Sequence, residues 1–132
     1  MNLKFVYVLV GTWFLFMVFA IINAGLRNGV YKPVVGEQAA HQISTIVFMT
    51  IILVITYIVL RFSNLNLSNR DAFFMGSIWL ILTIAFEFLA GHYAFGNSWD
   101  HLLADYNILK GRIWSLVLVT IFFSPYLTSK LL

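Results

Sequence analysis

Hydrophobic residues occur along this chain in four long runs, which polar segments rich in Gly, Asn and charged residues separate. Each run approaches the roughly 20 mainly apolar residues that a helix needs to span a bilayer. The pattern predicts transmembrane helices over about residues 5–24, 41–60, 73–90 and 113–127. Helices are expected rather than strands, because every backbone amide in lipid must be bonded within its own segment.

The polar segments predict how these helices begin and end. Ser68 or Asn69 is expected to cap the third helix, with Asp71 in its first turn. Ser98 is a candidate N-cap for a short amphipathic helix over about residues 99–106, which would lie at the membrane surface. The first connection is expected to be mostly loop, because four helix-breaking residues punctuate it: Gly25, Gly29, Pro33 and Gly36.

The predicted fold is therefore all-α and forms a single domain over residues 1–132. It is a polytopic membrane protein with four transmembrane helices in a bundle and a short interfacial helix between helices three and four. A bundle of this size has limited interior, so we expect a homo-oligomer or a subunit of a larger membrane complex.

The first helix has features of a signal peptide, since Lys4 precedes an apolar stretch and Val18-Phe19-Ala20 is similar to a cleavage site. The apolar run continues past Ala20, so we expect a retained helix. Ala20 and Ala24 form a small-xxx-small pair, which is typical of close helix contact.

Composition supports lipid as the solvent of this chain, because 61% of its residues are hydrophobic and only 10% are charged. Soluble domains average about 25% charged residues. The chain has no cysteine, which excludes disulfides and thiolate chemistry. The net charge of +3 is not gathered in a basic run, so membrane lipids, and not nucleic acid, are the expected partners.

Charges and histidines are distributed unequally between the two ends of the predicted bundle. We call the end with both termini and the middle loop side A, and the end with the other two loops side B. Each side holds four Lys or Arg residues, so the positive-inside rule is balanced and dual topology stays open. If Arg112 is buried, side A leads by four to three, which favours cytoplasmic termini. All three histidines lie on side B or at its edge, with four acidic residues: Glu37, Glu87, Asp100 and Asp105.

Glu87 and Arg112 are the strongest candidates for an intramembrane pair. Glu87 lies near the C-terminal end of the third helix and Arg112 at the N-terminal end of the fourth, where the helix dipole disfavours each charge. Antiparallel helices bring these two ends to the same level, so we predict an ion pair. Such charges usually face a bundle interior and are functional candidates; the pair would otherwise simply fasten two helices.

His41 follows Glu37 by four residues, and Ser44 and Thr45 follow one turn later. These residues form either a polar cap at the membrane interface or a His–carboxylate pair that faces a cavity.

The other site candidates are His92, Trp99, Asp105 and Tyr106. Trp99 and Tyr106 belong either to an aromatic belt at the interface or to the wall of a pocket for a lipid-like ligand. The spacing of histidines and acids permits metal binding, but no HExxH motif is present, and we expect no metal and no cofactor.

The second half of the chain resembles a recurring signature of small bacterial four-helix membrane proteins. This resemblance implies the four-helix fold and brings no activity. It rests on Glu87-Phe88, Gly91-His92, Ser98-Trp99, residues 102–107 and Gly111-Arg112-Ile113-Trp114, together with Ala40-His41-Gln42.

Two function classes follow from the sequence. The first is a binding, assembly or transport-related membrane subunit whose Glu/His/Arg cluster opens to side B. The second is a small membrane enzyme for a lipidic or amphipathic substrate, with Glu87 or His92 as acid or base and Arg112 on an anionic group.

Overall fold

The structure is a computed structural model, which describes residues 3–94, 96, 98–100 and 114–131. Helices make up nearly all of this part, and it contains no strand. The elements in chain order are α1 (Leu3–Leu26), the π-helix η1 (Arg27–Tyr31), α2 (Lys32–Val35), α3 (Glu37–Ser63), α4 (Asn69–Leu89), the π-helix η2 (Ala90–Ala94) and α6 (Trp114–Lys130).

Three helical stretches are long and apolar enough to cross a membrane: Leu3–Val35, Glu37–Ser63 and Asn69–Leu89. Many large apolar side chains of these stretches are exposed, as Tyr7, Ile46 and Ile81 show, which fits a surface solvated by lipid. The fourth predicted span is also an apolar helix, but Ser115–Lys130 is shorter than the other three. The predicted surface helix over residues 99–106 lies mostly outside the described residues.

The prediction that the first connection is a loop is wrong. The chain stays helical through η1 and α2 to Val35, and α3 begins at Glu37. Gly36 alone makes the turn, with φ +89° and ψ 170°, a conformation that is essentially restricted to glycine. Its N–H donates to the Lys32 carbonyl at 3.0 Å, and its own carbonyl accepts from Ala40 N–H at 3.0 Å. One residue therefore closes one helix and opens the next.

The predicted cap of the third span is confirmed, since the Ser68 hydroxyl oxygen accepts a hydrogen bond from Asp71 N–H at 3.1 Å.

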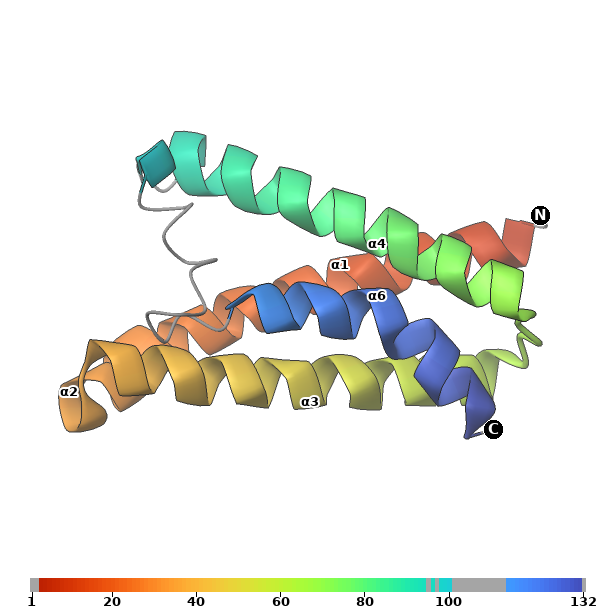
Figure 1. Ribbon diagram of the computed structural model, residues 1–132, viewed down its shortest axis with the longest axis horizontal. Helices are drawn as coiled ribbons and strands as arrows, with labels where there is room; N and C mark the ends of the chain where they lie inside the picture. Colours follow the sequence, from red (N-terminus) through yellow and green to blue (C-terminus); the bar gives the residue numbers. More distant parts are fainter. Residues whose placement is uncertain (1–2, 95, 97, 101–113, 132) are drawn as a thin grey trace.

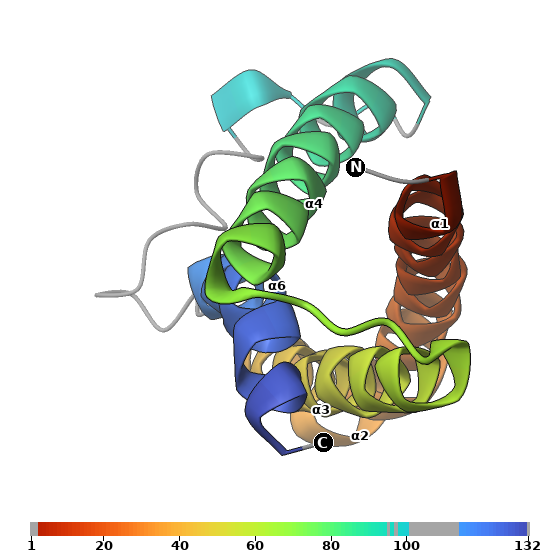
Figure 2. The same cartoon turned by 90° about the vertical axis from the view of Figure 1, so that its right-hand side faces the viewer.

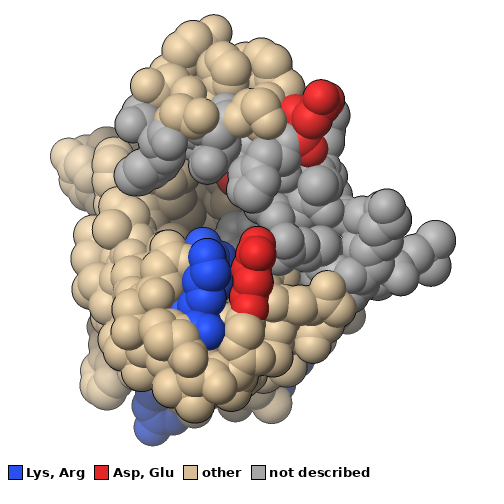
Figure 3. Space-filling view, turned by 90° about the vertical axis from the view of Figure 1, so that its left-hand side faces the viewer, with Lys and Arg blue, Asp and Glu red and all other residues tan. Residues whose placement is uncertain are grey.

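The helices alternate in direction, and α1 therefore runs parallel to α4 (Figure 1). Seen along the bundle, the order around the ring is α1, α3, α6 and α4 (Figure 2). Both termini lie at the same end as residues 64–68, as predicted for side A. Figure 2 faces side A, and Figure 3 faces side B, where Gly36 and η2 lie.

Helix α6 packs closely on α4 and α3. A Cβ on Gly76 of α4 would overlap the backbone of Phe122 in α6, so the two helices meet there without an intervening side chain. Pro125 lies within α6 and lacks the N–H that would bond the Ile121 carbonyl. The Ser124 hydroxyl donates to that carbonyl at 3.0 Å instead. A side chain thus satisfies the backbone group that the proline leaves open.

Candidate ligand site at side B

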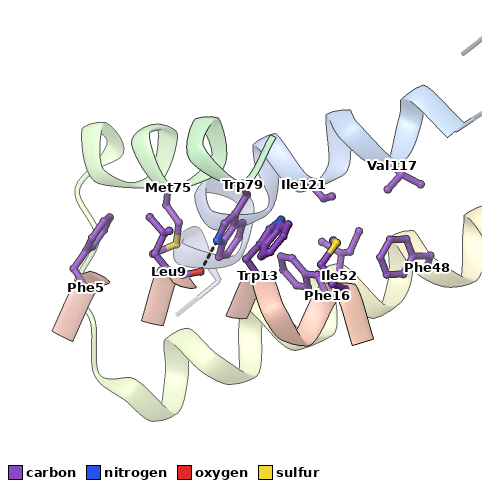
Figure 4. Close-up of a cluster of buried hydrophobic side chains, with 11 residues drawn as sticks. Phe5, Leu9, Trp13, Phe16, Phe48, Ile52, Met75, Trp79, Val117 and Ile121 are labelled. Atoms are coloured by element: carbon purple, nitrogen blue, oxygen red, sulfur yellow. Dashed lines mark hydrogen bonds between the residues drawn. The ribbon is translucent and has the colours of Figure 1, made fainter. Parts of the chain in front are cut away.

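Two tryptophans brace the side-A half of α1 against α4. Trp79 Nε1 donates to the Leu9 carbonyl at 2.9 Å (Figure 4). Trp13 Nε1 donates to the Thr83 hydroxyl at 3.1 Å. Both pairs are 70 residues apart in the sequence, as parallel helices in fixed register require. Phe16 adds an edge contact to Trp79, with ring centroids 4.9 Å apart. Side chains therefore fill this half of the α1–α4 interface.

Towards side B the two helices diverge (Figure 1). At the same level the residues on the facing stripe become small. On α1, helical spacing continues the stripe of Leu9, Trp13 and Phe16 through Ala20 and Ala24, and on α4 Ala90 follows Phe86. Small residues normally let helices approach closely. Here the helices separate instead.

The space-filling view of side B shows a hollow between the end of α4 and the turn from α1 to α3 (Figure 3). A basic and an acidic side chain lie next to each other at its rim. The described basic residues of this turn are Arg27 and Lys32, and its acidic residue is Glu37. Arg27 is half-buried, whereas Lys32 and Glu37 are exposed.

A buried polar group joins α1 to α3 near this end. Asn23 is 6% exposed, and its Nδ2 donates to the Ser44 carbonyl at 2.8 Å. A carbonyl can only accept, so this contact fixes which end of the amide faces Ser44. The other end, Oδ1, has no hydrogen-bond partner among the described residues. A buried acceptor without a hydrogen bond lowers the free energy of unfolding by about 1–3 kcal/mol.

His41 belongs to the same group and is only 4% exposed. Its carbonyl accepts hydrogen bonds from the hydroxyls of Ser44, at 3.0 Å, and Thr45, at 2.7 Å. The histidine therefore lies inside the bundle and not on its rim. Its predicted pairing with Glu37 stays a prediction.

Aromatic rings gather where α4 passes into η2. The His92 imidazole stacks on the Trp99 indole, with centroids 3.8 Å apart and planes 11° apart. Tyr93 lies edge-on to His92 at 4.9 Å, and Phe88 lies 6.4 Å from Trp99. The stack fastens the segment before residue 100 to the end of α4.

The structure thus brings together two of the predicted site residues, His92 and Trp99. Glu87 is half-buried near the end of α4. The predicted Glu87–Arg112 pair cannot be placed, because Arg112 lies outside the described residues, as do Asp105 and Tyr106. Within the described part of the chain, no group of three or more metal-ligating side chains occurs.

Sequence reasoning did not select Asn23 as a candidate site residue. Its signal was present, since it is the first side-chain amide after a long apolar run. It also missed Tyr93 and Phe88, whose contacts depend on the turn that follows α4.

No known protein family, no curated protein and no solved structure matches this chain.

Proposed function

We propose that this protein is an integral membrane binding or assembly subunit that accepts an amphipathic partner at side B. One observation carries the proposal: the contacts of α1 with α4 end at Trp13 and Phe16 on α1 and at Phe86 on α4, and beyond them lies a hollow with charged residues at its rim (Figure 3). A protein interior is normally close-packed, so a persistent opening of this kind favours occupancy by another molecule.

Polar groups support side B as the binding end. An amide and an imidazole, Asn23 and His41, are buried there, whereas the buried polar side chains nearer side A are hydroxyls, of which Thr56, Ser124 and Thr128 donate to carbonyls of their own helices. Intramembrane polar residues usually mark ligand or ion paths. A subunit in transport or assembly would use such a group to orient the polar end of its partner. We place the termini in the cytoplasm as part of this proposal, which makes side B the outer face.

The proposal is tested by removing the charges at the rim. The double variant Arg27→Ala/Glu37→Ala is extracted from membranes in polymer-bounded discs, and mass spectrometry identifies what is retained. The matched control is Arg70→Ala/Asp71→Ala at side A, which removes the same charge types. Glu37 and Asp71 each lie in the first turn of a helix, so the cost to the helix dipole is similar in both variants.

We expect the wild type and the side-A control to retain a partner molecule that the side-B variant loses. Equal retention by all three proteins would refute the proposal. The enzymatic alternative predicts a further result, namely that Glu87→Gln leaves the partner bound and blocks its conversion.

A further inference from the structure

The part of α1 beyond its contacts with α4 is about as long as one leaflet of a bilayer is thick. Phe16 is the last large aromatic residue on the α1 stripe, and Arg27 is eleven residues further along. At 1.5 Å per residue this is about 16 Å, or half of the roughly 30 Å hydrocarbon core. A chain that enters at the rim would therefore end near the membrane mid-plane, at Phe16 and at Phe86, which packs edge-on to Trp13.

The walls of this groove suit hydrocarbon. Ala20 and Ala24 on α1, and Ala90 after α4, are partly buried and offer no polar side-chain atom. The neighbouring outer surfaces are apolar too, since Ile21, beside the stripe of Ala20 and Ala24, and Leu89 are each 57% exposed. The groove is thus continuous with the lipid-facing surface, and a bilayer lipid can enter it sideways without crossing water.

The rim suits a headgroup with both charges. The guanidinium of Arg27 is a preferred partner of phosphate, and Lys32 lies nearby in the sequence. Glu37 supplies a carboxylate at the same turn, and an oppositely charged pair of side chains is visible at the rim (Figure 3). A carboxylate favours an ammonium group and disfavours a second negative charge.

From these three features we infer that the α1–α4 groove holds one phospholipid of the side-B leaflet with a zwitterionic aminoalcohol headgroup. Its phosphate lies at Arg27, its ammonium group lies at Glu37, and one acyl chain runs along Ala20 and Ala24 to Phe16. The inference rests on the proposed function and names the class of its ligand.

The test fills the groove and changes the lipid. Delipidated protein in detergent is titrated with phosphatidylethanolamine or phosphatidylglycerol of identical acyl chains, and native mass spectrometry counts the bound lipid. Ala20→Leu places a larger side chain in the groove. Ala85→Leu is the matched control, because Ala85 is exposed on α4 outside the groove.

We expect the wild type and Ala85→Leu to retain one phosphatidylethanolamine, and Ala20→Leu to bind it at least roughly tenfold more weakly, a loss of about 1.4 kcal/mol. Equal binding by Ala20→Leu and Ala85→Leu would overturn the groove as the site. The headgroup comparison uses the wild type alone, so it holds even if Ala20→Leu fails to fold. Phosphatidylglycerol binding as tight as phosphatidylethanolamine would overturn the headgroup class.

These outcomes are separable from those of the proposed function. If Arg27→Ala/Glu37→Ala releases a partner but Ala20→Leu does not affect lipid binding, the proposed function stands and the lipid groove fails. If the rim variant retains everything that the wild type retains, the proposed function itself fails.

Discussion

Replacing Gly76 with alanine tests how α4 is fastened to α6. An added Cβ would overlap the Phe122 carbonyl oxygen and lie 2.9 Å from its carbonyl carbon and 3.2 Å from its Cα. All three neighbours are backbone atoms, so no side-chain rotation can make room. The helices must move apart, which separates contacts such as the stack of Phe73 on Tyr126, now 4.9 Å between ring centroids.

Two opposing terms set the size of the effect. Alanine is favoured over glycine inside a helix by about 0.8–1.0 kcal/mol. Overpacking of a close contact typically costs about 1–3 kcal/mol, and a contact with rigid backbone belongs at the upper end of that range. We therefore expect Gly76→Ala to lower the free energy of unfolding by up to about 2 kcal/mol.

Gly11→Ala provides the control, because no atom lies within 4 Å of the Cβ position at Gly11. Gly11→Ala has the same gain in helix propensity as Gly76→Ala but no overlap with a neighbouring helix. The difference between their free energies of unfolding therefore measures the cost of the overlap. The assay is denaturant unfolding in mixed micelles, followed by circular dichroism. If both variants unfold at the same denaturant concentration, the close approach of α4 and α6 is refuted.

Two further substitutions test the turn at Gly36 and the indole brace. Gly36→Ala forces a side chain into a glycine-only conformation and should destabilise the protein by about 1–3 kcal/mol in the same unfolding assay. Gly29→Ala, which is neither crowded nor at positive φ, should not; equal loss in both would contradict the one-residue turn. A double-mutant cycle of Trp13→Phe with Thr83→Val should give a coupling energy of about 0.6 kcal/mol, the average for interhelical hydrogen bonds in membranes. Zero coupling would show that this bond does not stabilise the protein.

Local signals predicted most of the helices. Apolar runs located the three long spans and the shorter fourth helix. Ser68 indicated the start of α4, because a serine hydroxyl can accept a hydrogen bond from the backbone N–H three residues later and so cap the helix. These features depend on neighbours in the sequence, and a single sequence contains them.

The turn at Gly36 illustrates where local reading fails. Gly25 and Gly29 weaken a helix by only about 1 kcal/mol each, a cost that continued hydrogen bonding through η1 can offset. Pro33 falls at the start of α2, where a missing N–H is tolerated. Residues that usually break helices therefore lie within one, and the break occurs at Gly36, the one glycine of this connection whose φ is positive.

The contacts of the candidate site could not be predicted from the sequence. Histidines and acids marked side B from the sequence alone. The stack of His92 on Trp99 depends on how the chain turns after η2, and the bond from Asn23 to Ser44 depends on the register between α1 and α3. Such register is a tertiary property, which one sequence without relatives does not reveal.

The division of the α1–α4 interface explains how one small bundle can be both stable and open. Hydrogen bonds of Trp13 and Trp79 hold the side-A half of α1 to the parallel helix α4, and the two indoles also fill space there. Stability there does not require contact further along, so α4 is free to diverge beyond Phe16. The position of that last aromatic residue then sets the depth of the groove. A large residue one turn after Phe16 would make the groove shorter than one leaflet is deep. A small residue in place of Phe16 would extend the opening past the mid-plane and would remove the contact of Phe16 with Trp79.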